Sequence, residues 1–230
     1  MQFEAPAPLA DLIMRHKGKR ICVMGGGPTL DADIANVKAD VWISVNDHGA
    51  RRREVDYVVC MDNIHTKNQQ EMRKFLRKYS DAPIISPWHW GQFQMLRWPD
   101  YPCLFNSGII ASWIASIMGG HPIIMAGFDC YGGRGRQLEM HRQYVKHIKG
   151  YVRVCSGILL EYYQQYDPKE RLGKYEPPDV FKEATEGFIK VRVDHPFHYR
   201  GYQWPPGTVL TVGEYEVRRQ LKHKSIVRVE

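Results

Sequence analysis

Long apolar runs are missing from this chain of 230 residues. No stretch approaches the roughly 18 consecutive apolar residues that a membrane-spanning helix needs. The first twenty residues contain an acid and prolines early and lack the apolar core of a signal peptide. We therefore expect a protein that does not cross a membrane and that works in the cytoplasm.

Cysteine is also scarce, and its five residues are scattered over positions 22, 60, 103, 130 and 155. No two of them form a C-x-x-C pair, so the sequence argues against a disulfide framework and against a zinc site. Cys22, Cys60 and Cys130 lie in or beside apolar runs and are expected to be small core residues.

The overall composition is that of a globular protein rather than a disordered one, because 43% of the residues are hydrophobic. The length suits one medium α/β domain with a small appendage. The formal charge of +7 fits a phosphate-bearing ligand or a polyanionic surface. Simple solubility explains the charge equally well, since both signs are mixed along the chain.

Two common nucleotide motifs are absent from the glycine-rich segment at 19–30. It is not G-x-G-x-x-G, because position 30 is leucine, and it is not a P-loop, because no Gly-Lys-Ser/Thr follows. It does join a short apolar strand, Ile21–Met24, to three glycines, and Pro28 suits the first turn of a helix.

Thr29 or Asp31 is expected to cap that helix. A strand, a glycine turn and a helix N-terminus together make an anion site, usually for phosphate. The alternative is a tight turn without a ligand.

Apolar strands alternate with helical patterns, which predicts a parallel sheet with crossover helices. The expected class is α/β, with a Rossmann-like, mostly parallel sheet and helices on both faces. The expected strands are 20–24, 41–45, 56–61, 82–86, 121–127 and 151–155, and the expected helices are 7–17, 31–37, 66–79, 107–118, 141–149 and 156–165.

Polar residues or glycines follow four of these strands. They are Gly25–Thr29, Asn46–Asp47, Asp62–Asn63 and Asp129–Tyr131. Ligands of parallel sheets bind outside the carboxyl ends of the strands, so the four segments are expected to share one ligand site. Ordinary loop polarity is the alternative.

The composition changes after residue 166, where the chain becomes charged and rich in proline. We expect a nucleotide-binding domain at 1–166, a linker or surface excursion at 167–187 and a small antiparallel β unit at 188–230. The unit is expected to be an SH3-like barrel with a short helix at 217–222. A unit this small is expected to pack on the main domain or on a second copy of the chain, which would make a homo-oligomer.

Four motifs in order resemble a known group: Met24–Leu30, Val45-Asn46, Asn106–Gly108 and Ala126–Tyr131. Over about residues 19–160 the chain is similar to the bacterial sialyltransferases of glycosyltransferase family 42 and to 6-hydroxymethylpterin diphosphokinase-like proteins. The C-terminal unit, with Tyr199–Gly201 and Pro205–Val209, resembles small β modules of tailed-phage proteins, which implies a phage-encoded protein in a host cytoplasm.

The resemblance to the sialyltransferases implies a nucleotide sugar as donor and no required cofactor. It implies that His141 is the general base, that Tyr131 stabilises the departing phosphate and that Asp129 belongs to the strand-end pair. The nucleotide-binding residues that it implies are Gly25, Gly26, Gly27, Pro28, Thr29, Asn46, Asp62, Asn63, Ser107 and Gly108.

The chain departs from the sialyltransferase pattern at two places. Gly26 stands where the transferases have asparagine, so a side-chain contact to the ligand is lost. No second tyrosine follows Tyr131 closely; Arg134 and Arg136 lie there and are expected to supply positive charge to a diphosphate.

Two other functions stay open. The first is a diphosphokinase-like enzyme in which Asp62 and Asp129 hold Mg²⁺ with a triphosphate. The second is a phage module that binds a nucleotide or DNA without catalysis. An aromatic-rich loop fits either base stacking or packing over the sheet; it contains Trp88, Trp90, Phe93 and Trp98.

Two further groups of residues are candidates for contact with a ligand. Arg51-Arg52-Arg53 is either a solvated run or a phosphate contact, and His195 with His198 is expected to be structural rather than metal-binding. The sequence favours a glycosyltransferase-like protein that depends on a nucleotide sugar similar to a CMP-sugar. The sequence leaves its donor sugar, acceptor and oligomeric state open.

Overall fold

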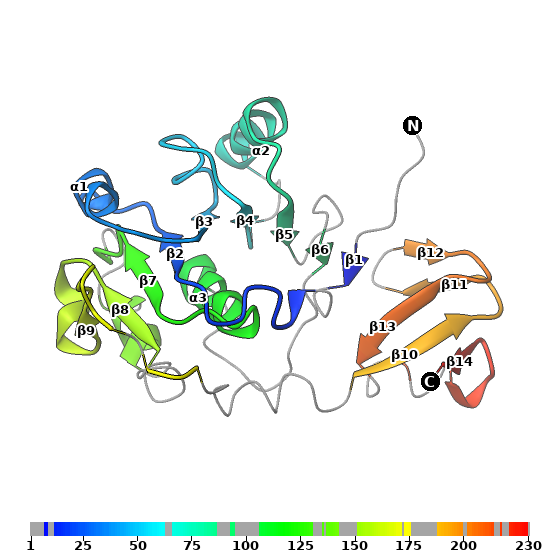
Figure 1. Cartoon of the computed structure of the whole chain (residues 1–230). Helices are drawn as coiled ribbons and strands as arrows, with labels where there is room; N and C mark the ends of the chain where they lie inside the picture. Colours follow the sequence, from blue (N-terminus) through cyan, green and yellow to red (C-terminus); the bar gives the residue numbers. More distant parts are fainter. Residues whose placement is uncertain are drawn as a thin grey trace.

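The structure is a computed structural model of the whole chain (Figure 1). It describes residues 7–8, 12–62, 66–86, 93–94, 106–130, 135, 137–142, 151–171, 173–175, 188–199, 202–213, 217 and 221–229.

Nine strands form one sheet within the described residues, and every pairing in it is parallel. The strand order is β1-β6-β5-β4-β3-β2-β7-β8-β9. The expected parallel α/β sheet is therefore confirmed. The strands are β1 (Ala7–Pro8), β2 (Ile21–Met24), β3 (Val41–Val45), β4 (Tyr57–Val59), β5 (Ile84–Ser86), β6 (Phe93–Gln94), β7 (Ile123–Ala126), β8 (Val152–Val154) and β9 (Gln164–Gln165).

The sheet changes direction at β2. From β2 the chain adds β3, β4, β5 and β6 on one side, and it then returns to add β7, β8 and β9 on the other side. In an open α/β sheet, such a switch point opens a crevice at the carboxyl ends of the two strands that flank it. Here those strands are β2 and β7.

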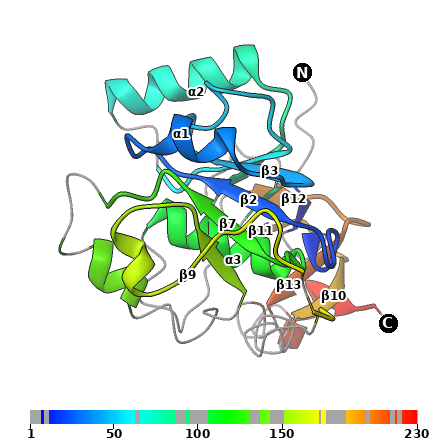
Figure 2. The same cartoon turned by 60° about the vertical axis from the view of Figure 1, so that its left-hand side comes forward.

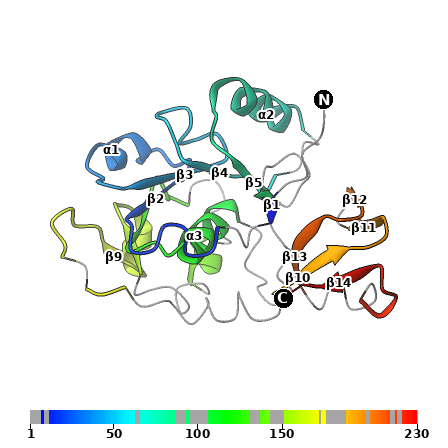
Figure 3. The same ribbon diagram turned by 45° about the vertical axis from the view of Figure 1, so that its right-hand side comes forward.

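Helices cover both faces of the sheet. Helix α1 (Leu30–Ala35) and helix α2 (Lys67–Tyr79) lie on one face, and α3 (Ser107–Ile117) lies on the other, as Figures 1, 2 and 3 show from three sides. Every residue of α3 after Ser107 is buried, as its apolar, small-residue sequence predicts. Among the described residues, no helix has the length and apolar character to span a bilayer.

Alternate residues of each strand enter two separate cores, because successive side chains of a strand point to opposite faces. On β2, Ile21 and Val23 pack with α3, and Cys22 and Met24 pack on the side of α1 and α2. With both faces covered, strand segments become continuous apolar runs. This double burial is why the sequence pattern located the central strands well.

The helix expected at 7–17 is wrong. Ala7–Pro8 forms a strand, residue 12 has a 3₁₀ conformation, and residues 13–18 form turns. The amides of Met14, His16 and Gly18 donate to carbonyls of Ile117, Met118 and Gly119, each at 2.8 Å. The carbonyls that end a helix lack intrahelical partners, and here segment 12–18 satisfies those at the end of α3 instead of its own helix.

The helix expected at 156–165 is also largely wrong. Only Ile158–Glu161 is helical, as one 3₁₀ turn, and Gln164–Gln165 pairs with β8 as strand β9. Gly157 lies at a φ of 83°, a left-handed conformation that glycine adopts easily and that does not continue into a regular helix.

The C-terminal unit holds two small antiparallel sheets. Strand β10 (Phe188–Val193) pairs with β13 (Val209–Gly213) and with β14 (Ile226–Arg228), while β11 (Phe197–Tyr199) and β12 (Tyr202–Trp204) form a hairpin. The antiparallel character is thus confirmed. Within the described residues the two sheets are separate, so an SH3-like barrel remains a prediction.

Candidate functional site

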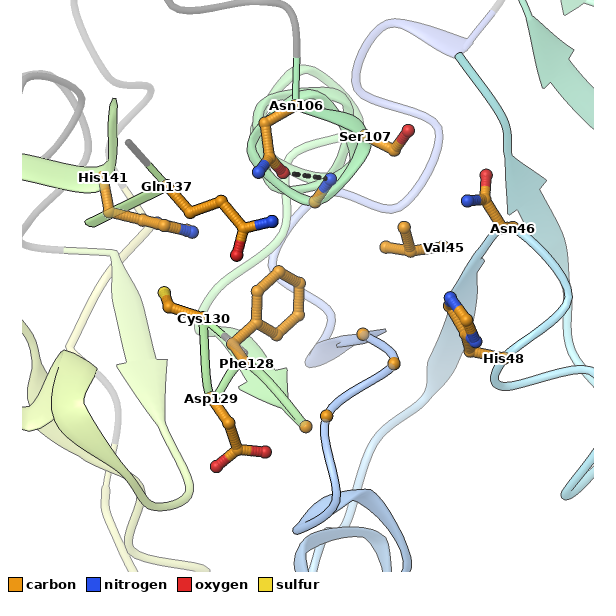
Figure 4. A pocket seen from close by; sticks show the side chains of 15 residues that line it. Val45, Asn46, His48, Asn106, Ser107, Phe128, Asp129, Cys130, Gln137 and His141 are labelled. Atoms are coloured by element: carbon orange, nitrogen blue, oxygen red, sulfur yellow. Dashed lines mark hydrogen bonds between the residues drawn. The ribbon is translucent and has the colours of Figure 1, made fainter. Parts of the chain in front are cut away.

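A crevice of about 380 Å³ opens where the sheet switches direction. Figure 4 shows that its walls come from the carboxyl ends of β2, β3 and β7, from the start of α3 and from the helical residues 137–142. The lining residues are Gly25, Gly26, Gly27, Val45, Asn46, His48, Asn106, Ser107, Gly108, Gly127, Phe128, Asp129, Cys130, Gln137 and His141. Three of the four strand ends singled out in the sequence therefore meet at one place.

Two amides of the glycine turn, where the sequence predicts an anion site, are already bonded within the protein. Gly25 donates its N–H to Ala126 at 2.8 Å, and Gly27 donates to Gly127 at 2.8 Å. A Cβ on Gly25 would lie 2.5 Å from the Gly127 carbonyl oxygen. These glycines are required because the turn packs directly against the loop after β7, which leaves no room for a side chain.

The start of α1 is likewise occupied by the protein itself. Thr29 makes no side-chain cap, contrary to expectation; its N–H and hydroxyl lie 3.1 and 2.9 Å from Oδ2 of Asp129. Pro28 precedes the helix, which begins at Leu30. An internal carboxylate thus takes the place at which the sequence predicts a phosphate.

The loop after β3 is organised by Ser44, which is fully buried. Its Oγ donates to the carbonyl of Asn46 at 2.8 Å and accepts from the amides of Gly49 and Ala50 at 2.9 and 3.1 Å. A single serine at the strand end therefore fixes the path of the residues that reach the crevice. No motif in the sequence around Ser44 indicates this role.

Asn46 lies at the crevice as predicted, with a φ of 52° that asparagine tolerates better than most residues. Its Nδ2 donates to Oδ2 of Asp62 at 2.9 Å, so Asp62 supports Asn46 and does not itself line the crevice. Within the described residues, Oδ1 of Asn46 is buried without a hydrogen-bond partner. A buried amide oxygen usually has a partner, so the hydrogen-bonding capacity of this atom is unused within the described residues.

His48 was not identified from the sequence, although it follows the same strand. Burial lowers the pKa of His48 from its ordinary value of 6.5, so the ring is uncharged at neutral pH. A Cβ on Gly26 would lie 2.6 Å from Nε2 of His48. The imidazole therefore fills the space beside Gly26, where a side chain at position 26 would otherwise lie.

Helix α3 begins at the crevice, and Asn106 caps it. Oδ1 of Asn106 accepts from the amides of Gly108 and Ile109 at 2.8 and 3.3 Å, and Figure 4 marks the first bond. A Cβ on Gly108 would lie 2.3 Å from the ring of Phe128, so glycine is required there. Ser107 and Gly108 line the crevice, and their binding of a nucleotide remains a prediction.

The loop after β7 is held by Asp33, a buried acid on α1. Its carboxylate accepts from the Gly127 amide at 2.8 Å and from the Ser156 hydroxyl at 2.7 Å. These bonds set the position of Phe128 and Asp129, which follow Gly127 and line the crevice. The helix, the β7 loop and the β8 loop are thereby joined through one side chain.

His141 lines the crevice, and its side chain is almost entirely buried. It is only 2% exposed, and burial lowers its pKa from 6.5 to about 4. Its ring meets Phe128 and Tyr163 edge-on, with centroids 6.0 and 6.3 Å apart. Nδ1 is buried without a hydrogen-bond partner among the described residues.

The described lining of the crevice is almost uncharged. It holds one acid, Asp129, and neither lysine nor arginine. The nearby basic run is engaged elsewhere: Arg51 pairs with Asp47, Arg52 pairs with Asp31, and Arg53 stacks on the ring of Trp42. A phosphate contact from this run is therefore not what the structure shows.

Several predicted residues lie outside the described part of the chain. They are Asn63, Tyr131, Arg134 and Arg136, and with them Trp88, Trp90, Trp98 and the side chains of Phe93 and His198. Their roles stay predictions.

The proposed magnesium ligands do not fit a shared metal site. Asp62 accepts from Asn46, and Asp129 accepts from Thr29, so each carboxylate already holds a donor from the protein. The described residues contain no group of three or more His, Cys, Asp or Glu side chains placed to hold a metal ion. We therefore derive no step through Mg²⁺.

The chain was compared with protein-family models and with curated proteins. The chain matches none of the protein-family models, and no curated protein matches it either.

Proposed function

We propose that this protein binds a nucleotide sugar in the crevice and transfers the sugar to an acceptor. The observation that carries the proposal is the crevice itself, which lies at the switch point between β2 and β7 beside a three-glycine turn. Ligands of open α/β sheets bind at such points. The volume of about 380 Å³ falls within the range of about 300–1,000 Å³ that is usual for small-molecule sites.

The polar groups available in the crevice suit the neutral parts of such a donor. Asn46 offers a buried carbonyl oxygen, and His48 and His141 offer uncharged imidazoles. Phe128 gives an apolar surface between the two histidines (Figure 4). Such surfaces pack against base or sugar rings.

The proposed transfer breaks one bond and forms one. An acceptor hydroxyl oxygen bonds to the anomeric carbon, the bond from that carbon to phosphate breaks, and the nucleotide leaves with the electron pair. The hydroxyl proton passes to His141, whose ring is neutral at neutral pH. A pKa of about 4 makes this a weak base, so the proton moves late, as the carbon–oxygen bond forms.

The test begins with binding and then asks for turnover. The unfolding temperature is measured with CMP, CDP, GTP and CMP-sugars, and release of CMP from CMP-sugars is followed with and without a chelator. His141→Ala is expected to keep nucleotide binding and to lose turnover. Unchanged turnover in that variant would remove His141 from the mechanism.

The other outcomes separate the remaining functions. Stabilisation by nucleotides without any turnover would indicate a non-catalytic binding module. Transfer of a diphosphate group from a triphosphate such as GTP that is lost on chelation, without release of CMP from CMP-sugars, would indicate the metal-dependent diphosphokinase. No stabilisation by any of these compounds, together with tight retention of DNA, would contradict the proposal and favour a DNA-binding module.

A further inference from the structure

We propose that His48 is a specificity-determining residue, which hydrogen-bonds the uncharged nucleoside part of a bound nucleotide while its ring rests on Gly26. The inference rests on the proposed nucleotide-binding function and names the part of the ligand that this side of the crevice recognises. It also assigns a purpose to Gly26.

The flat face of the His48 ring, rather than its edge, is turned toward Gly26. A Cβ built on Gly26 would lie 2.6 Å from Nε2 and 2.7 Å from both Cδ2 and Cε1. Nearly equal distances to three adjacent ring atoms place Gly26 over the ring face rather than at its edge. A ring nitrogen bonds in the plane of the ring, so the hydrogen-bonding direction of Nε2 is not taken up by Gly26.

The backbone of His48 is held on both sides. Its N–H donates to Val45 at 3.3 Å, and its carbonyl accepts from the guanidinium of Arg52 at 3.1 Å. In the portion of the chain that the structure describes, the ring nitrogens have no such partner. The backbone of His48 is therefore held in place, and the polar atoms of its ring remain available to a ligand (Figure 4).

The chemistry of the ring selects the kind of partner. A neutral imidazole carries one donor and one acceptor, which suits a base edge or a sugar hydroxyl. Phosphates are recognised best by arginine and lysine, which the described lining lacks, and the lining includes the acid Asp129. The nucleoside is therefore the part of the ligand that fits beside His48.

The first experiment compares cytidine with CMP by titration calorimetry. His48→Ala is expected to weaken both ligands by the same factor, about tenfold, which is the effect of losing roughly 1.4 kcal/mol. His48→Gln, which keeps a donor and an acceptor, is expected to retain most of the affinity. His195→Ala removes an exposed imidazole in the C-terminal unit and serves as the matched control.

The second experiment uses the contact with Gly26. The φ of Gly26 lies outside the left-handed region, so the backbone tolerates alanine, and the three atoms nearest to a Cβ at this position all belong to the imidazole. Gly26→Ala is expected to displace the ring and to weaken cytidine as much as His48→Ala does. In the His48→Ala background, the same substitution is expected to cost nothing further.

The outcomes separate this inference from the proposed function. Wild-type protein that binds neither cytidine nor CMP would overturn the nucleotide function and the inference with it. Wild-type binding that His48→Ala leaves unchanged would overturn the inference alone. A loss confined to CMP would place His48 at the phosphate, and additive losses from the two substitutions would show that Gly26 does not act through His48.

Discussion

Thr29 and Asp129, one hundred positions apart in the sequence, are joined by two contacts to a single carboxylate oxygen. The Thr29 amide lies 3.1 Å and the Thr29 hydroxyl 2.9 Å from Oδ2 of Asp129. The same hydroxyl lies 3.0 Å from Oδ2 of Asp33. A hydroxyl has one proton, so the two carboxylates share it, in addition to the amides of Gly127 and Thr29 that donate to Asp33 and Asp129 respectively.

Removing that hydroxyl is expected to destabilise the fold. Thr29→Val keeps the shape of the side chain but leaves Asp33 and Asp129 without their shared donor. Hydrogen bonds to charged groups are worth about 2 kcal/mol, so we expect the free energy of unfolding to fall by about that amount. Urea unfolding measures it.

Thr29→Ser retains the hydroxyl and is the control for Thr29→Val. It is expected to stay within about 0.5 kcal/mol of wild type. Equal losses in the two variants would show that the methyl group, and not the hydroxyl, supports this end of α1.

His141 is expected to make stability depend on pH. The unfolded ring takes up a proton near pH 6.5, whereas the folded ring resists protonation until its pKa of about 4. Above 6.5 both states are neutral, and the group adds no pH dependence. As the pH falls from 6.5 towards 4, only the unfolded state gains a proton, so stability decreases by up to about 3 kcal/mol.

The measurement is urea unfolding in steps from neutral pH to about pH 4. In His141→Phe, the free energy of unfolding is expected to depend much less on pH, because phenylalanine packs against Phe128 and Tyr163 without titrating. His195→Ala, at an exposed position, is expected to keep the slope. If the free energy of unfolding of His141→Phe depends on pH as strongly as that of wild type, other groups cause the pH dependence.

Asn46 allows its backbone role to be separated from its side-chain role. At a φ of 52°, glycine is unstrained and alanine costs about 1 kcal/mol or more. Asn46→Gly is therefore expected to be more stable than Asn46→Ala, as measured by urea unfolding. The reverse order would contradict the left-handed conformation.

Ligand binding by the same variants tests the carboxamide of Asn46. If its unpartnered oxygen accepts from the nucleoside, Asn46→Gly and Asn46→Ala weaken cytidine alike, because both remove the oxygen. Retained affinity in either one, measured by calorimetry, would assign Asn46 a purely structural role.

The segment 167–187, assigned to a linker, is anchored near its start by Glu170. Glu170 accepts from Nε and Nη2 of Arg153 on β8, at 3.0 and 2.8 Å, and the Arg153 side chain is 9% exposed. Glu170→Gln removes a charge opposite a buried guanidinium and is expected to cost about 2 kcal/mol in urea unfolding.

Asp31→Asn is the control for that substitution. Asp31 pairs with Arg52 at the surface, with its side chain 70% exposed, so its loss is expected to cost less than about 1 kcal/mol. If Glu170→Gln proves equally mild, the residues after 167 are not fastened to the sheet through this pair.

Much of the sheet could be predicted from local patterns. Ile21–Met24, Val41–Val45 and Ile123–Ala126 are apolar on both sides because helices cover both faces, and each was predicted within a few residues of its bounds. The helix predicted at 7–17 is wrong although the periodicity of the segment is helical, because amides within 12–18 bond to the end of α3. Tertiary contacts overrode local preference there.

The site could be located from sequence, but its chemistry could not. Glycines and polar residues at strand ends identify the crevice, because parallel strands bring those ends together. The occupied amides of the glycine turn and the place of His48 beside Gly26 depend on contacts between distant segments. Nothing near either residue in the sequence signals them.

Helix α3 has consequences for how the crevice responds to changes far from it. Its first turn supplies Ser107 and Gly108 to the ligand side, and its last carbonyls are fastened by residues 14–18. Eleven residues at about 1.5 Å each separate the two ends by roughly 16 Å. Truncating or tagging the chain near residue 14 would therefore remove support from the C-terminal end of α3, and the N-terminal end of the same helix lines the crevice.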